Sequence, residues 1–315
     1  MAIRRDLRDL PEPGAPDPEP RFAHVLAEVW RDRSIAERAD HVPSGKPFIH
    51  SDAGKCARAI AYRAAGIPRS EEMDLSGYWN TTLGTLVHEA WQGSLAERFG
   101  AAATFEVECG IAAIDSLGYI DALIDIEPTE GGGTPFRTSI EYKTIGGYGF
   151  KAAVGKARKG TPPEGPKHDH KLQAAVNGLA VNADEVVVAY GAKECISYVD
   201  GPDAMCAEWT FSRDEYEPIA RAEVERVKGI LGLLDGGELA ARKIPGVPGE
   251  IVNASKGEWR QFEWDGDDRA DASPMLIDTG TAWQCKYCSW QSLCAQTPAG
   301  RLPVEQVVEL GKKAA

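Results

Sequence analysis

Three short segments between residues 104 and 144 constrain the fold more than any other part of the sequence. They are TFEVEC (104–109), GYIDALIDIE (118–127) and TSIEYKT (138–144), and Gly-rich or polar turns separate them. Alternating or apolar segments of this length, bounded by turn residues, predict β-strands. Consecutive strands joined by short connections then predict a meander that feeds a larger sheet.

Helices and further strands are predicted on both sides of this meander. The helices lie at residues 51–66, 80–100, 170–182 and 212–237, and the strands at 184–191, 194–200 and 206–212. Residues suited to N-cap positions begin the first two helices, at Ser51 or Asp52 and at Asn80 or Thr81. Ser212 and Glu215 form a capping box at the start of the fourth. This order predicts an α/β fold in which helices flank a mixed central sheet.

Bulk properties narrow the class of protein. The chain has 315 residues, 43% of them apolar and 26% charged, which is enough for one large domain or two. Residues 1–20, rich in Pro, Arg and Asp, predict a disordered arm. Neither a secretory signal pattern nor an apolar run of membrane-spanning length stands out, so we expect a cytoplasmic protein with no membrane partner.

The charge distribution is uneven. A net charge of -13 argues against a surface broadly adapted to nucleic acid. Residues 151–171 nevertheless carry six Lys or Arg against two acids, which makes them a basic segment. Such a segment is by itself most often a solvated connection.

Two acids and a lysine lie on predicted strands at positions where they can meet. Side chains two apart on a strand share a face, so Glu141 and Lys143 project together, and Asp121 can approach Glu141 if their strands pair. Two converging carboxylates suit Mg²⁺ or Mn²⁺. Exposed cross-strand pairs of this kind are also common without any catalytic role. Asp125 shares the face of Asp121 but lies further along the strand, so we expect it to be structural or supporting.

The order of four motifs gives these residues a family context. Gly118 to Asp121 read G-x-x-D, Ile140 to Lys143 read as an apolar residue before E-x-K, and Gln173 lies on the next predicted helix. Together with the G-x-x-x-H of Gly84 to His88, this order resembles the PD-(D/E)XK nuclease superfamily and its RecB-like branch. A lone helical histidine is more often structural. A zinc-protease motif is excluded because HEAWQ lacks the second histidine of H-E-x-x-H.

Three cysteines near the end of the chain, Cys285, Cys288 and Cys294, form the pattern C-x2-C-x5-C. The iron-sulfur branch of the resembled superfamily includes CRISPR-associated RecB-like exonucleases, AddB-type subunits and phage exonucleases. It places one cysteine before the nuclease core and three after it. The resemblance therefore implies Cys56 as the fourth ligand of a [4Fe-4S] cluster. Zinc is the competing metal, although structural zinc usually takes its thiolates as two close pairs.

The resemblance also implies a domain plan. The core would be restriction-endonuclease-like, a mixed central sheet flanked by helices, with an N-terminal helical block and a C-terminal iron-sulfur segment packed together. Residues 21–296 would form one nuclease domain closed by its N- and C-terminal cysteines, and residues 297–315 a tail.

The activity implied by the resemblance is metal-dependent DNA exonuclease. Mg²⁺ or Mn²⁺ would be held by His88, Asp121, Glu141 and the backbone carbonyl of Tyr142. Lys143 would orient the attacking water or stabilise developing charge. Gln173 would help to position the substrate, whereas Asn177 replaces the tyrosine that completes the Q-x-x-x-Y motif of the family.

The expected partner is DNA, as single strands or ends, in phage or bacterial recombination, repair or replication, together with proteins of those pathways. The basic segment would contact the DNA backbone through Lys151, Lys156, Arg158 and Lys159. Two alternatives remain. One is a non-catalytic DNA-end-binding module, and the other is a nuclease subunit that trims DNA for CRISPR adaptation.

Overall fold

The computed structural model describes residues 25–39, 44–127, 135–155, 162–194, 205–241, 252–254, 258–263, 275–277, 288–298 and 300–314. The chain divides into two compact units. The first comprises Met1–Val42 and Met73–Leu83, and the second comprises Pro43–Glu72 and Gly84–Ala315. In the described part of the chain, no helix combines the length and apolar character needed to cross a membrane. The predicted arm at 1–20 and all but the first residue of the predicted strand at 194–200 lie outside the described residues.

The first unit contains α1 (Val25–Ala39) and the beginning of α3 (Leu75–Phe99). The Trp30 and Trp79 rings pack with their centroids 4.6 Å apart. The predicted N-cap at Asn80 or Thr81 is wrong, because α3 begins at Leu75. The backbone N–H of Gly77 donates to Asp74 Oδ1 at 2.6 Å, so Asp74 satisfies one of the free donors at the helix start.

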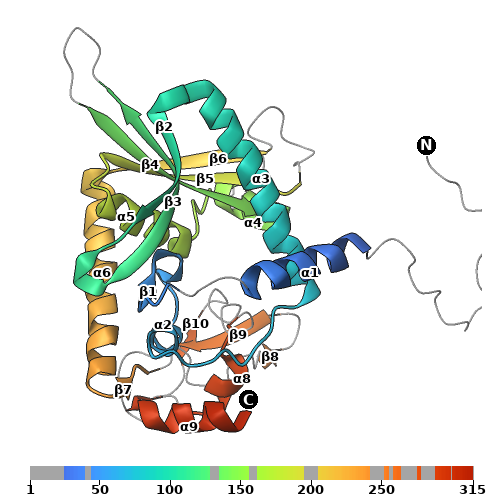
Figure 1. Ribbon diagram of the computed structural model, residues 1–315, viewed down its shortest axis with the longest axis vertical. Helices are drawn as coiled ribbons and strands as arrows, with labels where there is room; N and C mark the ends of the chain where they lie inside the picture. The colour runs from blue at the N-terminus through green and yellow to red at the C-terminus, as the bar shows by residue number, and fades with distance from the viewer. Residues whose placement is uncertain are drawn as a thin grey trace, which may run out of the picture. The chain divides into compact units, whose positions relative to one another are not determined.

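The second unit is built on a six-stranded sheet of order β1-β3-β4-β5-β6, in which β2 also pairs with β3 (Figure 1). The strands are β1 (Phe48–Ile49), β2 (Ala103–Cys109), β3 (Ser116–Ile126), β4 (Phe136–Ile145), β5 (Glu185–Ala192) and β6 (Cys206–Ser212). The β2-β3-β4 meander is antiparallel, β4 and β5 are parallel, and β6 is antiparallel to β5. The predicted meander and mixed sheet are therefore confirmed.

Helices cover both faces of this sheet (Figure 1). Val187 and Ala189 of β5 pack with Val87 and Trp91 of α3. The alternate residues of β5, including Val188, belong to the larger core, which also contains residues of α5 (His168–Ala180) and α6 (Arg213–Asp235). Burial on both faces explains why β5 is a continuous apolar run. The capping box of Ser212 and Glu215 is present at the start of α6.

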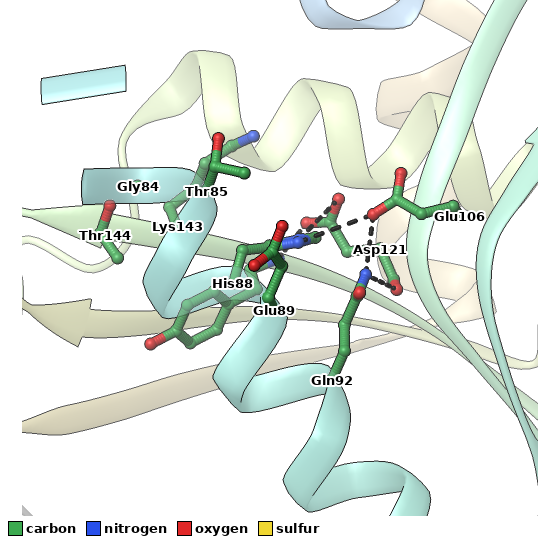
Figure 2. Close-up of a pocket in the computed structure, with 10 residues that line it drawn as sticks. Gly84, Thr85, His88, Glu89, Gln92, Glu106, Asp121, Lys143 and Thr144 are labelled. Atoms are coloured by element: carbon green, nitrogen blue, oxygen red, sulfur yellow. Dashed lines mark hydrogen bonds and ion pairs between the residues drawn. The ribbon is translucent and has the colours of Figure 1, made fainter. Parts of the chain in front are cut away.

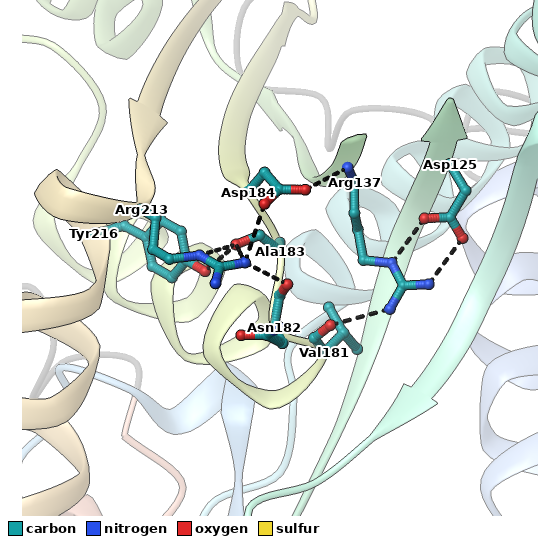
Figure 3. A network of polar contacts seen from close by, with 8 residues as sticks. All are labelled: Asp125, Arg137, Val181, Asn182, Ala183, Asp184, Arg213 and Tyr216. Carbon is teal, nitrogen blue, oxygen red and sulfur yellow. Dashed lines mark hydrogen bonds and ion pairs between the residues drawn. The ribbon is translucent and has the colours of Figure 1, made fainter. Parts of the chain in front are cut away.

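Two arginines anchor the chain just after α5 (Figure 3). Arg213 donates to the carbonyl oxygens of Asn182 and Ala183 at 2.7 and 2.8 Å. Arg137 donates to the Val181 carbonyl at 3.2 Å and forms a two-pronged pair with Asp125 at 2.7 and 3.1 Å. The backbone carbonyls that follow the helix are thus satisfied, which fixes α5 on the sheet. Asp125, expected to be structural or supporting, is paired with Arg137 in this network.

The region predicted as one helix over 51–66 has two parts. Residues His50–Asp52 form a 3₁₀ turn, and α2 spans Ala57–Ala64 with Cys56 at its N-cap. Asp52 is buried and pairs with Lys55 and Arg63, so its carboxylate is not available to cap a helix. The end of the helix near Gly66 is as predicted, and Gly66 has a φ of +65°.

Residues 297–315, predicted as a tail, contain folded elements. Leu302–Pro303 form β11, which pairs with β7 (Glu238–Leu239), and α9 spans Val304–Ala314. Leu302 is 3% exposed. Buried Arg58 of α2 donates to the carbonyl oxygens of Ala240, Pro298 and Gly300, so this segment docks on the helix that follows Cys56.

The remaining elements are 3₁₀ turns at Gly100–Ala102 and Ala112–Ile114, α4 (Gly147–Val154), α8 (Gln291–Ala295), and a separate sheet of β8 (Val252–Ala254), β9 (Glu258–Glu263) and β10 (Met275–Ile277). Helix α4 was not predicted, because the glycines at 147 and 149 lower helix propensity.

Candidate active site

A pocket of about 580 Å³ opens where α3 passes the meander (Figure 2). It is lined by Gly84, Thr85, His88, Glu89 and Gln92 of α3, Glu106 of β2, Asp121 of β3, and Tyr142, Lys143 and Thr144 of β4. Gly84 and His88 of the helical G-x-x-x-H, the strand-borne Asp121 and the lysine of E-x-K therefore line one concave surface, whereas the glutamate of E-x-K, Glu141, is not among the lining residues.

Three side chains in this pocket form a candidate metal site. Ligand atoms of His88, Glu106 and Asp121 all lie within 4.8 Å of one another. His88 Nε2 is 3.1 Å from Asp121 Oδ1, and His88 Nδ1 is 3.6 Å from Glu106 Oε1. Figure 2 shows both carboxylates facing the imidazole ring. One imidazole and two carboxylates form a donor set that fits Mn²⁺ well and Mg²⁺ acceptably.

Glu106 was not predicted as a site residue. It lies between the ladder pairs Phe105–Ala122 and Val107–Ile120, so the register places it opposite Asp121. Its φ is +48°, a left-handed conformation that costs a non-glycine residue about 1–3 kcal/mol. Strained backbone of this kind concentrates at functional sites, where the surrounding structure holds it in place.

Gln92 holds two parts of this site in place. It follows His88 by four residues on α3, so the two side chains lie on one face of the helix. Its Nε2 donates to Glu106 Oε1 at 2.7 Å and to the Asp121 backbone carbonyl at 3.1 Å. Its spacing of four residues from His88 is the feature of the sequence that could have predicted a place for Gln92 in the site.

Asp121 and the E-x-K strand meet as expected. The β3–β4 ladder runs to the pair Ala122–Ile140, and one residue further along Asp121 Oδ2 accepts a hydrogen bond from the Tyr142 backbone N–H at 2.6 Å. Glu141 is 1% exposed; its Oε1 contacts Lys143 Nζ, and its Oε2 accepts from Asn177 Nδ2 at 3.0 Å. The carboxylate of Glu141 is thus held on both sides next to the pocket.

The environment shifts the pKa values of these groups. Burial raises the pKa of Glu141 to about 7, against the opposing effect of the Lys143 charge. Burial disfavours the charged form of Lys143, but the carboxylates of Glu141 and Asp121 outweigh it and leave the pKa of Lys143 raised. The hydrogen bond with Asp121 is the main reason why the pKa of His88 is raised. Perturbed groups gathered in a cleft mark a candidate catalytic site.

The other predicted substrate-binding residues are less closely associated with the pocket. Gln173 is half-buried on α5, one turn before Asn177. Lys151 lies on α4 and not in a loop. Lys156, Arg158 and Lys159 lie outside the described residues.

Three of the four cysteines predicted to hold a cluster are described. Cys56 precedes α2, Cys294 is buried on α8, and Cys288 precedes α8. Burial raises the pKa of Cys288, and the charges of Cys56 and Cys294 raise it further. Cys285 lies outside the described residues.

No protein-family model matches the chain, and no curated protein matches it. Similar solved structures include SSO0001, which is 18% identical, with a TM-score of 0.41 over 65% of this chain and 86% of that chain. An alkaline exonuclease (LHK-Exo) from Laribacter hongkongensis is 14% identical, with a TM-score of 0.39 over 66% and 96%. The structure of LHK-Exo in complex with dAMP is 15% identical, with a TM-score of 0.40 over 61% and 89%. Likeness at this level does not establish a family or an activity for the chain.

Proposed function

We propose that this chain is a divalent-metal-dependent DNA exonuclease of the RecB-like PD-(D/E)XK type. The observation that carries this proposal is the convergence of His88, Glu106 and Asp121 within 4.8 Å, beside the pair formed by buried Glu141 and partly exposed Lys143. An imidazole and several carboxylates around one point suit a divalent cation, and a lysine beside them suits the hydrolysis of a phosphodiester.

The metal ligands of the proposed enzyme are His88, Asp121 and Glu106, with Glu141 and the Tyr142 carbonyl as the further ligands that the family resemblance implies. When bound, the ion would polarise the scissile phosphate and acidify a water molecule. Gln92 holds the Glu106 carboxylate and the Asp121 backbone in place, which reduces the rearrangement that metal binding requires.

Lys143 supplies the positive charge of the proposed site. Its side chain is 28% exposed and lines the pocket, and its raised pKa keeps the ammonium group protonated at neutral pH. Such a group stabilises negative charge that develops on phosphoryl oxygens, or orients the attacking water through its N–H donors. Gln173 is proposed to assist in positioning the substrate.

The proposed substrate is single-stranded DNA or a DNA end, and Lys151, Lys156, Arg158 and Lys159 are proposed to follow its backbone. Proteins of recombination, repair or replication are the corresponding partners. A non-catalytic end-binding module and a CRISPR-adaptation subunit remain the alternatives. Retention of all four of His88, Asp121, Glu141 and Lys143 favours an active enzyme.

We further propose a [4Fe-4S] cluster on Cys56, Cys285, Cys288 and Cys294. The influence of Cys56 and Cys294 on the pKa of Cys288 supports this ligand set. The docking of the C-terminal segment on α2 through Arg58 also supports a site shared by cysteines from both ends of the pattern. Zinc is the competing occupant.

The test is digestion of DNA labelled at either end, in Mn²⁺, Mg²⁺ or chelator, with protein purified without oxygen. We expect the wild-type protein to release nucleotides only when the metal is present. The Glu141→Ala and His88→Ala variants should release none. A gel-shift assay on the same DNA tests the alternative of a non-catalytic end-binding module. Such a module would shift the DNA in the presence of either metal ion but would not shorten it.

A further inference from the structure

A chain of buried polar groups leads from the backbone of Ile111 to the Glu141 carboxylate. The Ile111 N–H donates to Ser116 Oγ at 2.9 Å, and Ser116 Oγ lies 2.9 Å from His50 Nε2. His50 Nδ1 lies 2.7 Å from Asn177 Oδ1, and Asn177 Nδ2 donates to Glu141 Oε2 at 3.0 Å. His50, Asn177 and Glu141 are each 1% exposed. This chain of hydrogen bonds therefore reaches Glu141 from the protein interior.

The orientation of the Asn177 amide follows from its two other neighbours. Its nitrogen faces the Tyr119 backbone carbonyl at 3.2 Å as well as Glu141 Oε2. A carbonyl oxygen can only accept, so the reversed amide would place oxygen against oxygen. Asn177 Oδ1 must then accept from His50, which requires a proton on His50 Nδ1.

The state of the His50 ring follows in turn. Burial lowers the pKa of His50, which favours the neutral ring, while the hydrogen bond with Asn177 acts in the opposite direction. A neutral ring protonated at Nδ1 leaves Nε2 as an acceptor for the Ser116 hydroxyl. Cys109 Sγ lies 3.7 Å from His50 Nδ1, and burial raises the pKa of Cys109 to about 12, so this neighbour remains an uncharged thiol. Each group in this chain of hydrogen bonds then donates to the next one, in the direction from Ile111 to Glu141.

Gly118 makes room for this arrangement. A Cβ at this position would lie 2.1 Å from His50 Nδ1 and 2.8 Å from Asn177 Oδ1. Real Cβ atoms do not approach other atoms so closely. The two atoms that it would meet, His50 Nδ1 and Asn177 Oδ1, are the two that hydrogen-bond to each other. The glycine of the G-x-x-D motif is therefore required for the packing of His50 against Asn177.

We propose that His50 and Asn177 are positioning residues that fix the Glu141 carboxylate for the hydrolysis proposed above, on which this role depends. Asn177 holds Glu141 Oε2, and the other oxygen is left to face Lys143. His50 holds the amide of Asn177, and Ser116 holds His50. A carboxylate fixed in this way does not have to be ordered when metal and substrate bind. Asn177 thus has a role at the position where the family motif has tyrosine.

Two variants of His50 separate its ring nitrogens. The amide nitrogen of His50→Asn can replace Nδ1 as the donor to Asn177, whereas His50→Gln reaches towards Ser116 and does not supply that donor. We expect kcat of His50→Gln to fall about tenfold or more relative to His50→Asn, because lost supporting hydrogen bonds typically cost about 10–100-fold. KM for DNA should change little, because neither side chain lines the pocket. Thermal unfolding curves establish that both variants are folded. Equal kcat values for the two folded variants would overturn the assignment.

A second measurement does not depend on catalysis. ¹⁵N NMR of the metal-free wild-type protein should show His50 neutral and protonated at Nδ1, and a proton on Nε2 alone would overturn the assignment. Mn²⁺ affinity, measured by calorimetry, should be lower in His50→Gln than in His50→Asn. If the wild type cleaves no DNA, the proposed function fails, while the NMR and Mn²⁺ measurements still decide whether His50 and Asn177 hold the Glu141 carboxylate in place.

Discussion

The imidazole of His88 on α3 lies 3.1 Å from the carboxylate of Asp121 on β3, measured from Nε2 to Oδ1. This contact joins a helix to the strand that also carries Gly118, three residues before Asp121. The hydrogen bond raises the pKa of His88 and so favours its protonated form in the metal-free protein. A metal ligand must release its proton, so the same contact keeps the ring oriented until a cation takes its place.

Glu106 gives the sharpest test of the metal site. The Glu106→Gln change keeps the shape of the side chain and its hydrogen bond with Gln92 but removes one anionic donor. We expect Mn²⁺ affinity, measured by calorimetry, to fall about tenfold or more, because cation affinity depends on the number of charged ligands. Glu108→Gln is the matched control, since Glu108 is exposed on the same strand and its side chain reaches Tyr119 at 3.4 Å. Similar affinities in the two variants would remove Glu106 from the site.

The pair of Glu141 and Lys143 predicts a pH-dependent stability. The pKa of Glu141 is about 7 in the folded protein and 4.5 as a free group, so its contribution to stability is present below pH 4.5 and is lost as pH rises through about 7. Lys143→Met removes the charge that opposes this rise. We expect the variant to match the wild type near pH 5 and to be about 2 kcal/mol less stable above pH 8, where the buried carboxylate must ionise without its partner.

Urea unfolding at a series of pH values measures this difference. Lys151→Met serves as the control, because Lys151 lies on α4 outside the pair. A loss of stability in Lys143→Met that is the same at pH 5 and pH 8 would mean that the ion pair does not control the charge of Glu141.

Much of the fold follows from local signals in the sequence. The meander was predictable because period-two patterns and turn residues are local, and the pairing of Asp121 with the E-x-K strand follows from that meander. The start of α3 was misplaced because Asp74 and Asn80 are both good caps by residue type, and only the fold decides which one is used.

The rest of the site depends on contacts between distant residues. Glu106 enters the site through a positive φ, which a strand pattern does not reveal. His50 and Asn177 are 127 positions apart, and their contact requires a glycine on a third element. Buried polar pairs of this kind have no periodic signature in the sequence.

The cysteine pattern predicts a coloured protein. Cys56→Ala and Cys288→Ala should each lose the visible absorption of a [4Fe-4S] cluster. Both variants should also unfold at a lower temperature, because the cluster would close a loop across most of the polypeptide. By analogy with a long disulfide loop, that closure is worth roughly 5 kcal/mol. Cys206→Ala is the control, because Cys206 is exposed on β6. A colourless wild type that contains stoichiometric zinc after anaerobic purification would assign the site to zinc instead.

The basic segment predicts a change in the salt dependence of DNA binding. Neutralising Lys151, Lys156, Arg158 and Lys159 together should weaken DNA binding and reduce the slope of log K against log salt, by about 0.7 for each lost contact with single-stranded DNA. Fluorescence anisotropy at several salt concentrations measures that slope. An unchanged slope would show that the four residues do not contact the DNA backbone.

The central claim is that one divalent cation binds between His88, Glu106 and Asp121, beside Glu141. Anomalous diffraction at the manganese edge, from crystals soaked in Mn²⁺, tests it most directly. We predict a strong peak within bonding distance of the His88 imidazole and at least two of the carboxylates, and no peak there in His88→Ala crystals. A fully soaked wild-type crystal with no peak at this position, or with manganese bound only elsewhere, would contradict the account.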